Sequence, residues 1–214
     1  MRVSLLLLRP TLTFLSLSAV LLLGYVGLLR ARPYEDGGLR DFLLPPEGCP
    51  APCWAGIQPG VTTVDEALLL LDAHEWIITP RLADNFQRSI GWGGIYWTWN
   101  DQQPAFIDTT RISYLNARDG LIQAIELRVN APFGEVLLVL GPPQSQSFAT
   151  LTQTRIIPHH AYFDPLLTTE SAVPCPITPT ALYGAPVSVN LTRQRYIPAY
   201  QYDEIVGMLS KRPC

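Results

Sequence analysis

The chain has 214 residues, of which 48% are hydrophobic, and this length accommodates one full domain or two small ones. Its charge is uneven, because the segment from residue 33 onward holds 11 basic and 18 acidic residues, a difference of −7. The arginines and lysines form no cluster, which argues against a surface built for nucleic-acid phosphates. We therefore expect no nucleic-acid partner.

The N-terminal region is dominated by an apolar run at residues 11–29. The run TLTFLSLSAVLLLGYVGLL contains no charge, and as a helix it would extend roughly 28 Å, the thickness of the hydrocarbon core of a bilayer. A cleaved signal peptide needs a small-residue cleavage site, which the following RARPYEDGG does not offer, and a lipoprotein signal needs a cysteine directly after the run. We expect an uncleaved transmembrane anchor over 11–29, preceded by a short cytoplasmic end at 1–10.

The cysteines indicate on which side of the membrane the rest of the chain lies. Arginines flank the apolar run almost equally on both sides, so the positive-inside rule leaves its orientation open. All four cysteines follow the run, and an even number suits disulfides in an oxidising compartment. We predict a single-pass protein of the cell membrane whose C-terminal domain is extracytoplasmic.

Four cysteines allow three pairings, and sequence alone does not select one. We favour Cys49 with Cys53, which closes a small loop, and Cys175 with Cys214, which clips the tail to the body of the domain. Free thiols and metal binding are the alternatives. CPAPC has a spacing that zinc sites use, but Cys175 and Cys214 form no matching second pair, so we expect no bound metal.

The segment 30–52 is rich in proline and glycine and has little periodicity. We therefore predict a linker without regular structure and a globular part that begins near Cys53.

A first helix is predicted from Thr63-Val-Asp-Glu66. This is a capping-box pattern, in which the threonine and glutamate side chains bond each other's backbone amides. The leucines at 68–71 cover more than one face of the helix, which predicts that the helix is deeply packed.

The opening of this helix recurs near residues 132–141, at an offset of 69 residues. Glu66 aligns with Glu135, and leucines at 68, 69 and 71 align with leucines at 137, 138 and 140. The second helix starts with Pro132, which suits the first helical position, and stops at Gly141-Pro142-Pro143.

Each helix is followed by about three runs of β-type sequence. After the first helix the runs are 93–100, 110–116 and 121–129, with a tight-hairpin signal at Asp119-Gly120 between the last two. After the second helix they are 145–151, 159–163 and 186–197. We predict an α+β fold in which the transmembrane helix is followed by two tandem helix-plus-antiparallel-sheet units, at 53–130 and 131–214, the second including the C-terminal tail.

The two openings, PGVTTVDEALLLLD and PFGEVLLVLGPPQ, resemble the G-x-T-x-x-E-V-x-x-x-L-G-x-P type of opening. This opening is found in bacterial extracytoplasmic domains of the BamE/SmpA-OmlA and β-lactamase-inhibitor-protein type. The resemblance implies a small α+β binding scaffold rather than an enzyme. Asp72 departs from the pattern, which has glycine there, and no contact residue matches, so no partner is carried over.

Residues for catalysis are sparse. The bases are His74, His159 and His160, and the sequence contains no G-x-S-x-G. His74 is placed to meet the carbonyl groups at the end of the first helix. In PHHAYFD, adjacent histidines of a strand point to opposite faces, so His159, His160 and Asp164 do not easily bind one ion. We assign no catalytic residue, metal ligand or cofactor and expect no enzyme, with a hydrolase using His159 or His160 as the least favoured alternative.

The most unusual feature is the aromatic run GWGGIYWTWN at 91–100. In a strand, Trp97 and Trp99 share one face while Tyr96 takes the other. The tryptophan face either packs in the core, which we favour, or forms an aromatic binding surface. Tyr96 and, on the neighbouring strand, Tyr114 are the candidate binding residues, because tyrosine is frequent at interface hot spots.

These features predict a membrane-anchored, extracytoplasmic, noncatalytic domain that binds a protein partner of the cell envelope through its sheet. A carbohydrate-binding or structural envelope module that uses the Trp/Tyr cluster is the alternative.

Overall fold

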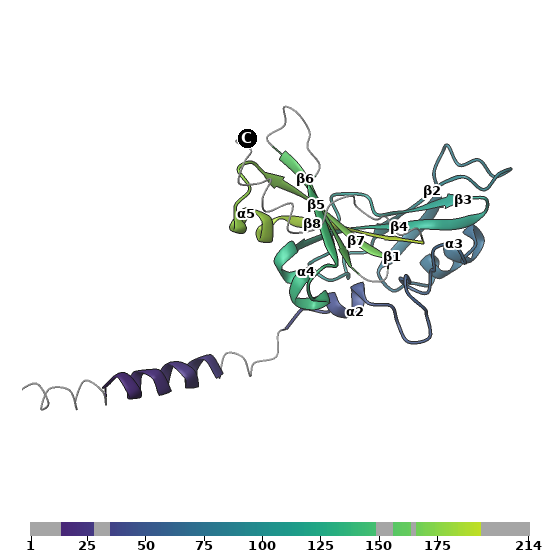
Figure 1. Cartoon of the computed structure of the whole chain (residues 1–214). Coiled ribbons are helices and arrows are strands. Elements are labelled where there is room, and N and C mark those ends of the chain that lie inside the picture. Colours follow the sequence, from purple (N-terminus) through teal and green to yellow (C-terminus); the bar gives the residue numbers. More distant parts are fainter. Residues whose placement is uncertain (1–13, 28–34, 149–155, 164–165, 194–214) are drawn as a thin grey trace, which may run out of the picture. The chain divides into compact units, whose positions relative to one another are not determined.

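The computed structural model describes residues 14–27, 35–148, 156–163 and 166–193 (Figure 1). Contacts divide the chain into two units, Met1–Glu35 and Asp36–Cys214. In the first unit, residues 14–27 form a helix with exposed side chains. Among the residues described, no helix is long and apolar enough to cross a membrane, and both ends of the predicted anchor at 11–29 lie outside them.

The second unit is α+β and is built on one antiparallel sheet of eight strands. The strands are β1 (Ile77–Leu82), β2 (Gly93–Trp99), β3 (Tyr114–Arg118), β4 (Leu121–Pro132), β5 (Ser145–Phe148), β6 (Ile156–Phe163), β7 (Leu167–Pro174) and β8 (Pro186–Thr192). Their spatial order is β1-β2-β3-β4-β8-β7-β6-β5. The order places the last strand of each half, β4 and β8, side by side at the centre.

The sequence predicted about three strands after each helix, and the structure has four. The two missed strands are β1 and β7. In β1 only Ile77 is buried and Thr79 has a positive φ, so the strand has no alternating pattern. In β7 every second residue is buried, but two of these are Thr169 and Ser171, and their polarity conceals the alternation.

Four short helices accompany the sheet: α2 (Leu39–Leu43), α3 (Val64–Asp72), α4 (Phe133–Leu140) and α5 (Pro179–Gly184). Figure 1 shows α2, α3 and α4 along the same face of the sheet. That face carries the buried side chains, among them Ile95, Leu115, Ile125 and Val189. The core therefore lies between one face of the sheet and the helices.

We expected residues 30–52 to be a linker without regular structure, and the structure places part of this segment in the core. Leu39, Phe42 and Leu43 of α2 are all buried, and the ring of Phe42 contacts Trp54 and Phe106 with centroids 5.8 and 5.2 Å away. Three apolar residues in five are enough to bury one face of a single helical turn. This segment is too short for its periodicity to be recognised in the sequence.

The helix α3 has the predicted capping box. Thr63 N donates to Glu66 Oε2 (2.9 Å), and Glu66 N donates to Thr63 Oγ1 (3.3 Å). The prediction of deep packing was wrong for part of the leucine run, because Leu71 is fully buried while Leu69 is 72% exposed. A helix against one sheet buries one stripe only.

The second helix repeats part of this burial pattern at the offset of 69 residues, although Val139 is buried where its counterpart Leu70 is 36% exposed. Val64 and Phe133 are both buried, as are Ala67 and Val136. Leu138, the counterpart of Leu69, is 63% exposed. Pro132 lies one residue earlier than predicted, at the N-cap, and Gly141 is the C-cap, as the terminator signal indicated.

Substitutions on α3 test this arrangement. Leu71→Ala should lower the free energy of unfolding by about 2–5 kcal/mol, because it leaves a cavity under the helix. Leu69→Ala is the matched control and should change it by no more than about 0.5 kcal/mol, since that side chain is in solvent. Urea denaturation of the full-length chain measures both values, and equal losses would contradict the assigned faces.

Candidate functional site

The face of the sheet opposite α2, α3 and α4, here called the open face, carries a row of polar and aromatic side chains. Its members are register partners on successive strands and together cross all eight strands. In spatial order this cross-sheet row is Arg81, Tyr96, Tyr114, Glu126, Asn190, Thr168, Tyr162 and Ser145. Arg81 is exposed and the others are partly exposed. Both tyrosines predicted as binding residues belong to this row.

The side chain of Tyr96 leans along its strand toward Gly94. A Cβ atom on Gly94 would lie 3.0 Å from both Cζ and Oη of Tyr96, so the ring covers the glycine that precedes it on the same face. The ring centroid of Tyr114 is 5.9 Å from that of Tyr96, with the ring planes tilted by 54°. The absence of a side chain at position 94 thus provides the space in which Tyr96 lies.

Tyr114 interacts with two charged side chains of β4, Glu126 and Arg128. Burial first, and then the hydrogen bond and charge of Glu126, raise the pKa of Tyr114 to about 12, while the charge of Arg128 opposes this rise. Glu126 also forms an ion pair with Arg128, two residues further along β4. Tyr114, Glu126 and Arg128 are therefore held together at the middle of the sheet.

Asn190 lies directly opposite Glu126 on β8. Its Oδ1 is buried and has no hydrogen-bond partner among the described residues, as is also true of the buried polar atoms Trp97 Nε1, Gln103 Oε1 and Thr169 Oγ1. Such an unpaired acceptor is uncommon, because a buried polar atom usually has a partner.

Two exposed isoleucines border the row on the side of β1 and β3. Ile78 is 47% exposed and pairs with Thr98, which lies two residues after Tyr96 and on the same face. Ile112 is 63% exposed and lies two residues before Tyr114. The first half of the open face therefore offers apolar as well as polar surface.

The tryptophans of the aromatic run take the other face, as favoured. Trp97 is buried and Trp99 packs against the core, whereas Trp92, outside β2, is 47% exposed. Trp54 stacks on Trp97 (centroids 5.8 Å apart) and on His74 (5.6 Å). These contacts place Trp97 in an aromatic layer beneath the sheet.

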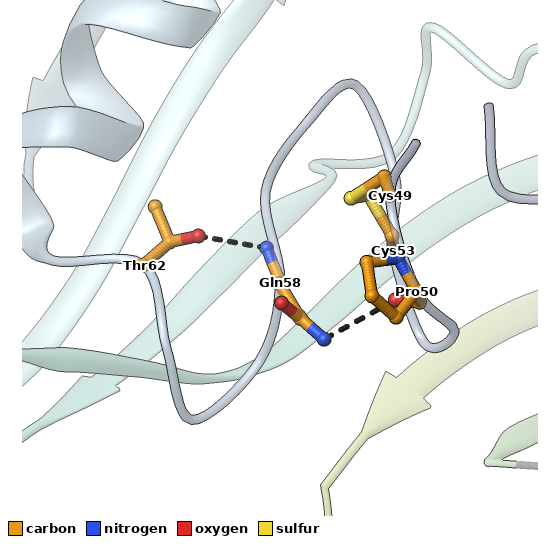
Figure 2. Close-up of a disulfide and its surroundings, with 5 residues drawn as sticks. All are labelled: Cys49, Pro50, Cys53, Gln58 and Thr62. Atoms are coloured by element: carbon orange, nitrogen blue, oxygen red, sulfur yellow. Dashed lines mark hydrogen bonds between the residues drawn. A yellow bond between two sulfur atoms is a disulfide. The ribbon is translucent and has the colours of Figure 1, made fainter. Parts of the chain in front are cut away.

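The structure confirms the predicted disulfide between Cys49 and Cys53, which closes the loop that precedes Trp54 (Figure 2). In the segment that follows, Gln58 Nε2 donates to Pro50 O (3.2 Å), and Gln58 N donates to Thr62 Oγ1 (2.8 Å). The disulfide and these bonds position the residue that follows Cys53, which is Trp54.

The second predicted disulfide joins Cys175 to Cys214. Cys175 is disulfide-bonded. Cys214 lies outside the described residues, so this pairing stays a prediction.

His74 makes a different hydrogen bond from the one predicted. Its Nδ1 accepts a hydrogen bond from Trp76 N (3.3 Å) instead of the imidazole donating to carbonyl groups of the helix end. Burial lowers the pKa of His74, in agreement with a neutral ring that accepts this bond.

His159 points into the core and His160 to the open face, as expected for neighbours in a strand. The ring of His159 is fully buried between Phe133 and Phe148, each with its centroid 4.7 Å away. Its Nδ1 lies 3.1 Å from Ser171 Oγ and its Nε2 lies 2.8 Å from Gln146 Oε1.

The buried pair of Ser171 and His159 offers no reactive group to a substrate, because Ser171 is only 4% exposed. On the open face, His160 is the register partner of both Ser147 and Glu170. No hydrogen bond or ion pair joins these three side chains in the described part of the chain. Neither arrangement gives support to the hydrolase alternative. Asp164 lies outside the described residues.

Over the described ranges, no group of three or more His, Cys, Asp or Glu side chains is placed to hold a metal ion.

No family model, no curated protein and no solved structure matches this chain.

Sequence reasoning found the two tyrosines of the row and missed its centre. Glu126 and Arg128 alternate with buried residues of β4, and this pattern was a signal that they face outward. Asn190 gave no such signal, because its position opposite Glu126 arises from pairing between strands more than sixty residues apart in the chain.

The position of the Tyr96 ring over Gly94 can be tested with the substitution Gly94→Ala. The added methyl group occupies the space of the ring, so we expect loss of the nuclear Overhauser contacts between the Tyr96 ring and residue 94, and altered contacts with Tyr114. Because a side chain can move, stability should fall by no more than about 1 kcal/mol. Unchanged contacts would refute this geometry.

Burial of His159 predicts a dependence of stability on pH. Desolvation first, and then the charge of His160, lower the pKa of His159 to about 4, against 6.5 in the unfolded chain. Between these values the unfolded state binds more protons, so stability is fully present above pH 6.5 and falls as the pH drops to 4, by up to about 3 kcal/mol.

His159→Gln should remove this slope, whereas the neighbouring His160→Gln should keep it. Urea denaturation at a series of pH values between 4 and 7 measures the slope. His74 is present in both variants and contributes equally to the pH dependence of their stability. An undiminished slope in His159→Gln would therefore show that a group other than His159 causes the pH dependence.

Proposed function

We propose that this protein is a noncatalytic binding module whose open face takes up a protein partner at the cell envelope. The observation that carries the proposal is the cross-sheet row, a continuous line of hydrogen-bonding and aromatic side chains across eight strands. Tyr96 and Tyr114 form its aromatic part, and the exposed Ile78 and Ile112 lie beside them. Tyrosines with adjoining apolar surface and fixed charges are typical of interface hot spots.

The rigidity of this surface also favours binding. Tyr96 is held over Gly94, and Tyr114 is held by Glu126, so these side chains lose little conformational freedom when a partner docks. A surface that is ordered before binding spends less of its interaction energy on ordering.

We further propose that the two halves of the second unit are copies of one α+β unit of the BamE/SmpA-OmlA kind. The support is that each helix is followed by four strands and that burial agrees at the offset of 69 residues for three aligned pairs, Val64 with Phe133, Ala67 with Val136 and Leu69 with Leu138. The apolar run at 11–29 would anchor the chain in the cell membrane with this unit on the extracytoplasmic side. The disulfide between Cys49 and Cys53 supports that side, because disulfides persist in oxidising compartments.

Carbohydrate binding is a second candidate, and the partly exposed ring of Tyr96 favours it. A partly exposed aromatic ring suits stacking on a sugar, but Trp97 and Trp54 are buried and take no part. A glycan array probed with the full-length chain separates this candidate from protein binding.

Crosslinking in the native membrane tests the principal proposal. With the full-length chain, mass spectrometry should identify one envelope protein, and Tyr96→Ala should reduce its yield by about tenfold or more, the loss expected for a hot-spot tyrosine.

Trp92→Ala is the matched control, because it removes an exposed aromatic side chain outside the cross-sheet row. Its yield should stay near that of the unaltered chain. Equal yields from Tyr96→Ala and the unaltered chain would refute the proposal, as would equal losses in both variants.

A further inference from the structure

The disulfide bond of Cys175 indicates where the C-terminal tail, residues 194–214, is attached to the sheet. Cys175 directly follows β7 and is disulfide-bonded. Cys49 and Cys53 are bonded to each other, which leaves Cys214 as the remaining one of the four cysteines. The predicted bond between Cys175 and Cys214 would fix the end of the tail beside the end of β7.

The tail starts at the opposite end of the sheet. β8 is antiparallel to β7, and the backbone N of its last residue, Thr192, donates to Leu166 O (3.2 Å), just before β7 begins. Leu166 and Cys175 are nine residues apart, roughly 30 Å along a strand. The tail therefore has to run back along the length of β7. The 20 residues from 194 to 213 extend over as much as roughly 66 Å, so their length is sufficient.

The open face of β6, β7 and β8 is the side of the sheet on which the tail has room. The helices α2, α3 and α4 lie along the other face (Figure 1), and α5 packs against α4. On the open face of β7, in contrast, Glu170, Ala172 and Pro174 are all exposed. The tail can therefore pass over this half of the open face without displacing a helix.

The open face carries an apolar patch at the end where Cys175 lies. Ile156 is opposite Pro174 and Pro158 is opposite Ala172 in the register of β6 and β7, and we call these four residues the β6–β7 patch. Ile156 is 55% exposed, Ala172 and Pro174 are exposed, and Pro158 is partly exposed. Contiguous exposed apolar surface is typical of a contact site.

The residues of the tail that precede Cys214 match this end of the open face in chemistry. Met208-Leu209 come six and five residues before Cys214, so they lie within roughly 20 Å of chain from it. Lys211-Arg212 carry positive charge, and the exposed carboxylate of Glu170 lies two residues before Ala172 on the same face. Apolar residues can thus meet the patch, and basic residues can meet the neighbouring acid.

We propose that the C-terminal tail lies across the open face of β6, β7 and β8 and is tied there by a disulfide between Cys214 and Cys175. Met208 and Leu209 cover the β6–β7 patch. The tail occupies this half of the open face, and the half formed by β1 to β4, with Tyr96 and Tyr114, is left for the partner. The location of the partner rests on the proposed function, whereas the position of the tail does not.

A photoreactive side chain tests the position of the tail. The full-length chain in lipid nanodiscs carries p-benzoylphenylalanine in place of Leu209, and mass spectrometry identifies the peptides crosslinked after irradiation. We expect crosslinks to 156–158 of β6 and 172–174 of β7. The same group in place of Leu69, a leucine 72% exposed on the helix side, is the matched control and should not label these strands. Crosslinks from position 209 to α3 or α4, or none within the chain, would overturn the inference.

The substitution Cys214→Ser tests the tie. It should lower the yield of crosslinks from position 209 to the β6–β7 patch by about tenfold or more, because the tail loses the high effective concentration that the disulfide gives it. Ser210→Ala, a small change in the tail that keeps the disulfide, should leave the yield unaltered. Equal yields with and without Cys214 would contradict the inference. So would a peptide map, made without reducing agent, that joins Cys175 to any other cysteine.

The two proposals fail in different ways. If a protein is captured through Tyr96 but the tail does not crosslink to the β6–β7 patch, the position of the tail is wrong and the binding module stands. If the tail crosslinks to the patch but no protein is captured through Tyr96, the position of the tail stands and the proposed function is wrong.

Discussion

The pairing of β4 with β8 is the contact on which the rest of the second unit depends. It joins two groups of four strands, each of which is continuous in the chain, and its register runs from Ala124 opposite Thr192 to Pro132 opposite Pro186. Without it, each half would expose an additional strand edge, and exposed edges invite pairing with other chains. With it, β1 and β5 are the edge strands among the described residues.

This pairing has opposite consequences on the two faces of the sheet. On the helix side it aligns Leu127 with Val189 and Ile125 with Leu191, which makes the two cores continuous. On the open face the same register places Glu126 against Asn190. Since side chains of a strand alternate between faces, a shift of one residue would exchange these roles and bury the charges.

Buried polar groups on the helix side of the sheet differ in whether they have hydrogen-bond partners. His159 has partners for both ring nitrogens and is enclosed by aromatic rings, so its bonds serve the packing of α4 and β5. Other buried polar atoms have no hydrogen-bond partner in the described part of the chain, among them Thr169 Oγ1 and Trp97 Nε1 on the helix side and Asn190 Oδ1 on the open face.

Local chemistry could be predicted where neighbouring residues decide it. The capping box at Thr63 and Glu66, the hairpin turn at Asp119-Gly120 and the end of α4 at Gly141 all occur where the sequence indicated. Each depends on bonds within a few residues. Burial of Trp97 and exposure of Tyr96 on opposite faces also follow from the alternation of a single strand.

Segments whose structure depends on distant contacts could not be predicted. β1 and β7 lack a clear alternating pattern, and the turn of helix at Leu39–Leu43 is too short to form without the core that covers it. The sequence by itself therefore determined the helix starts, the turns, one disulfide and two tyrosines of the candidate site. Only the tertiary structure decided that eight strands form one sheet and that Asn190 meets Glu126, because pairing between strands remote in the chain is set by the packing of the whole core and leaves no local pattern.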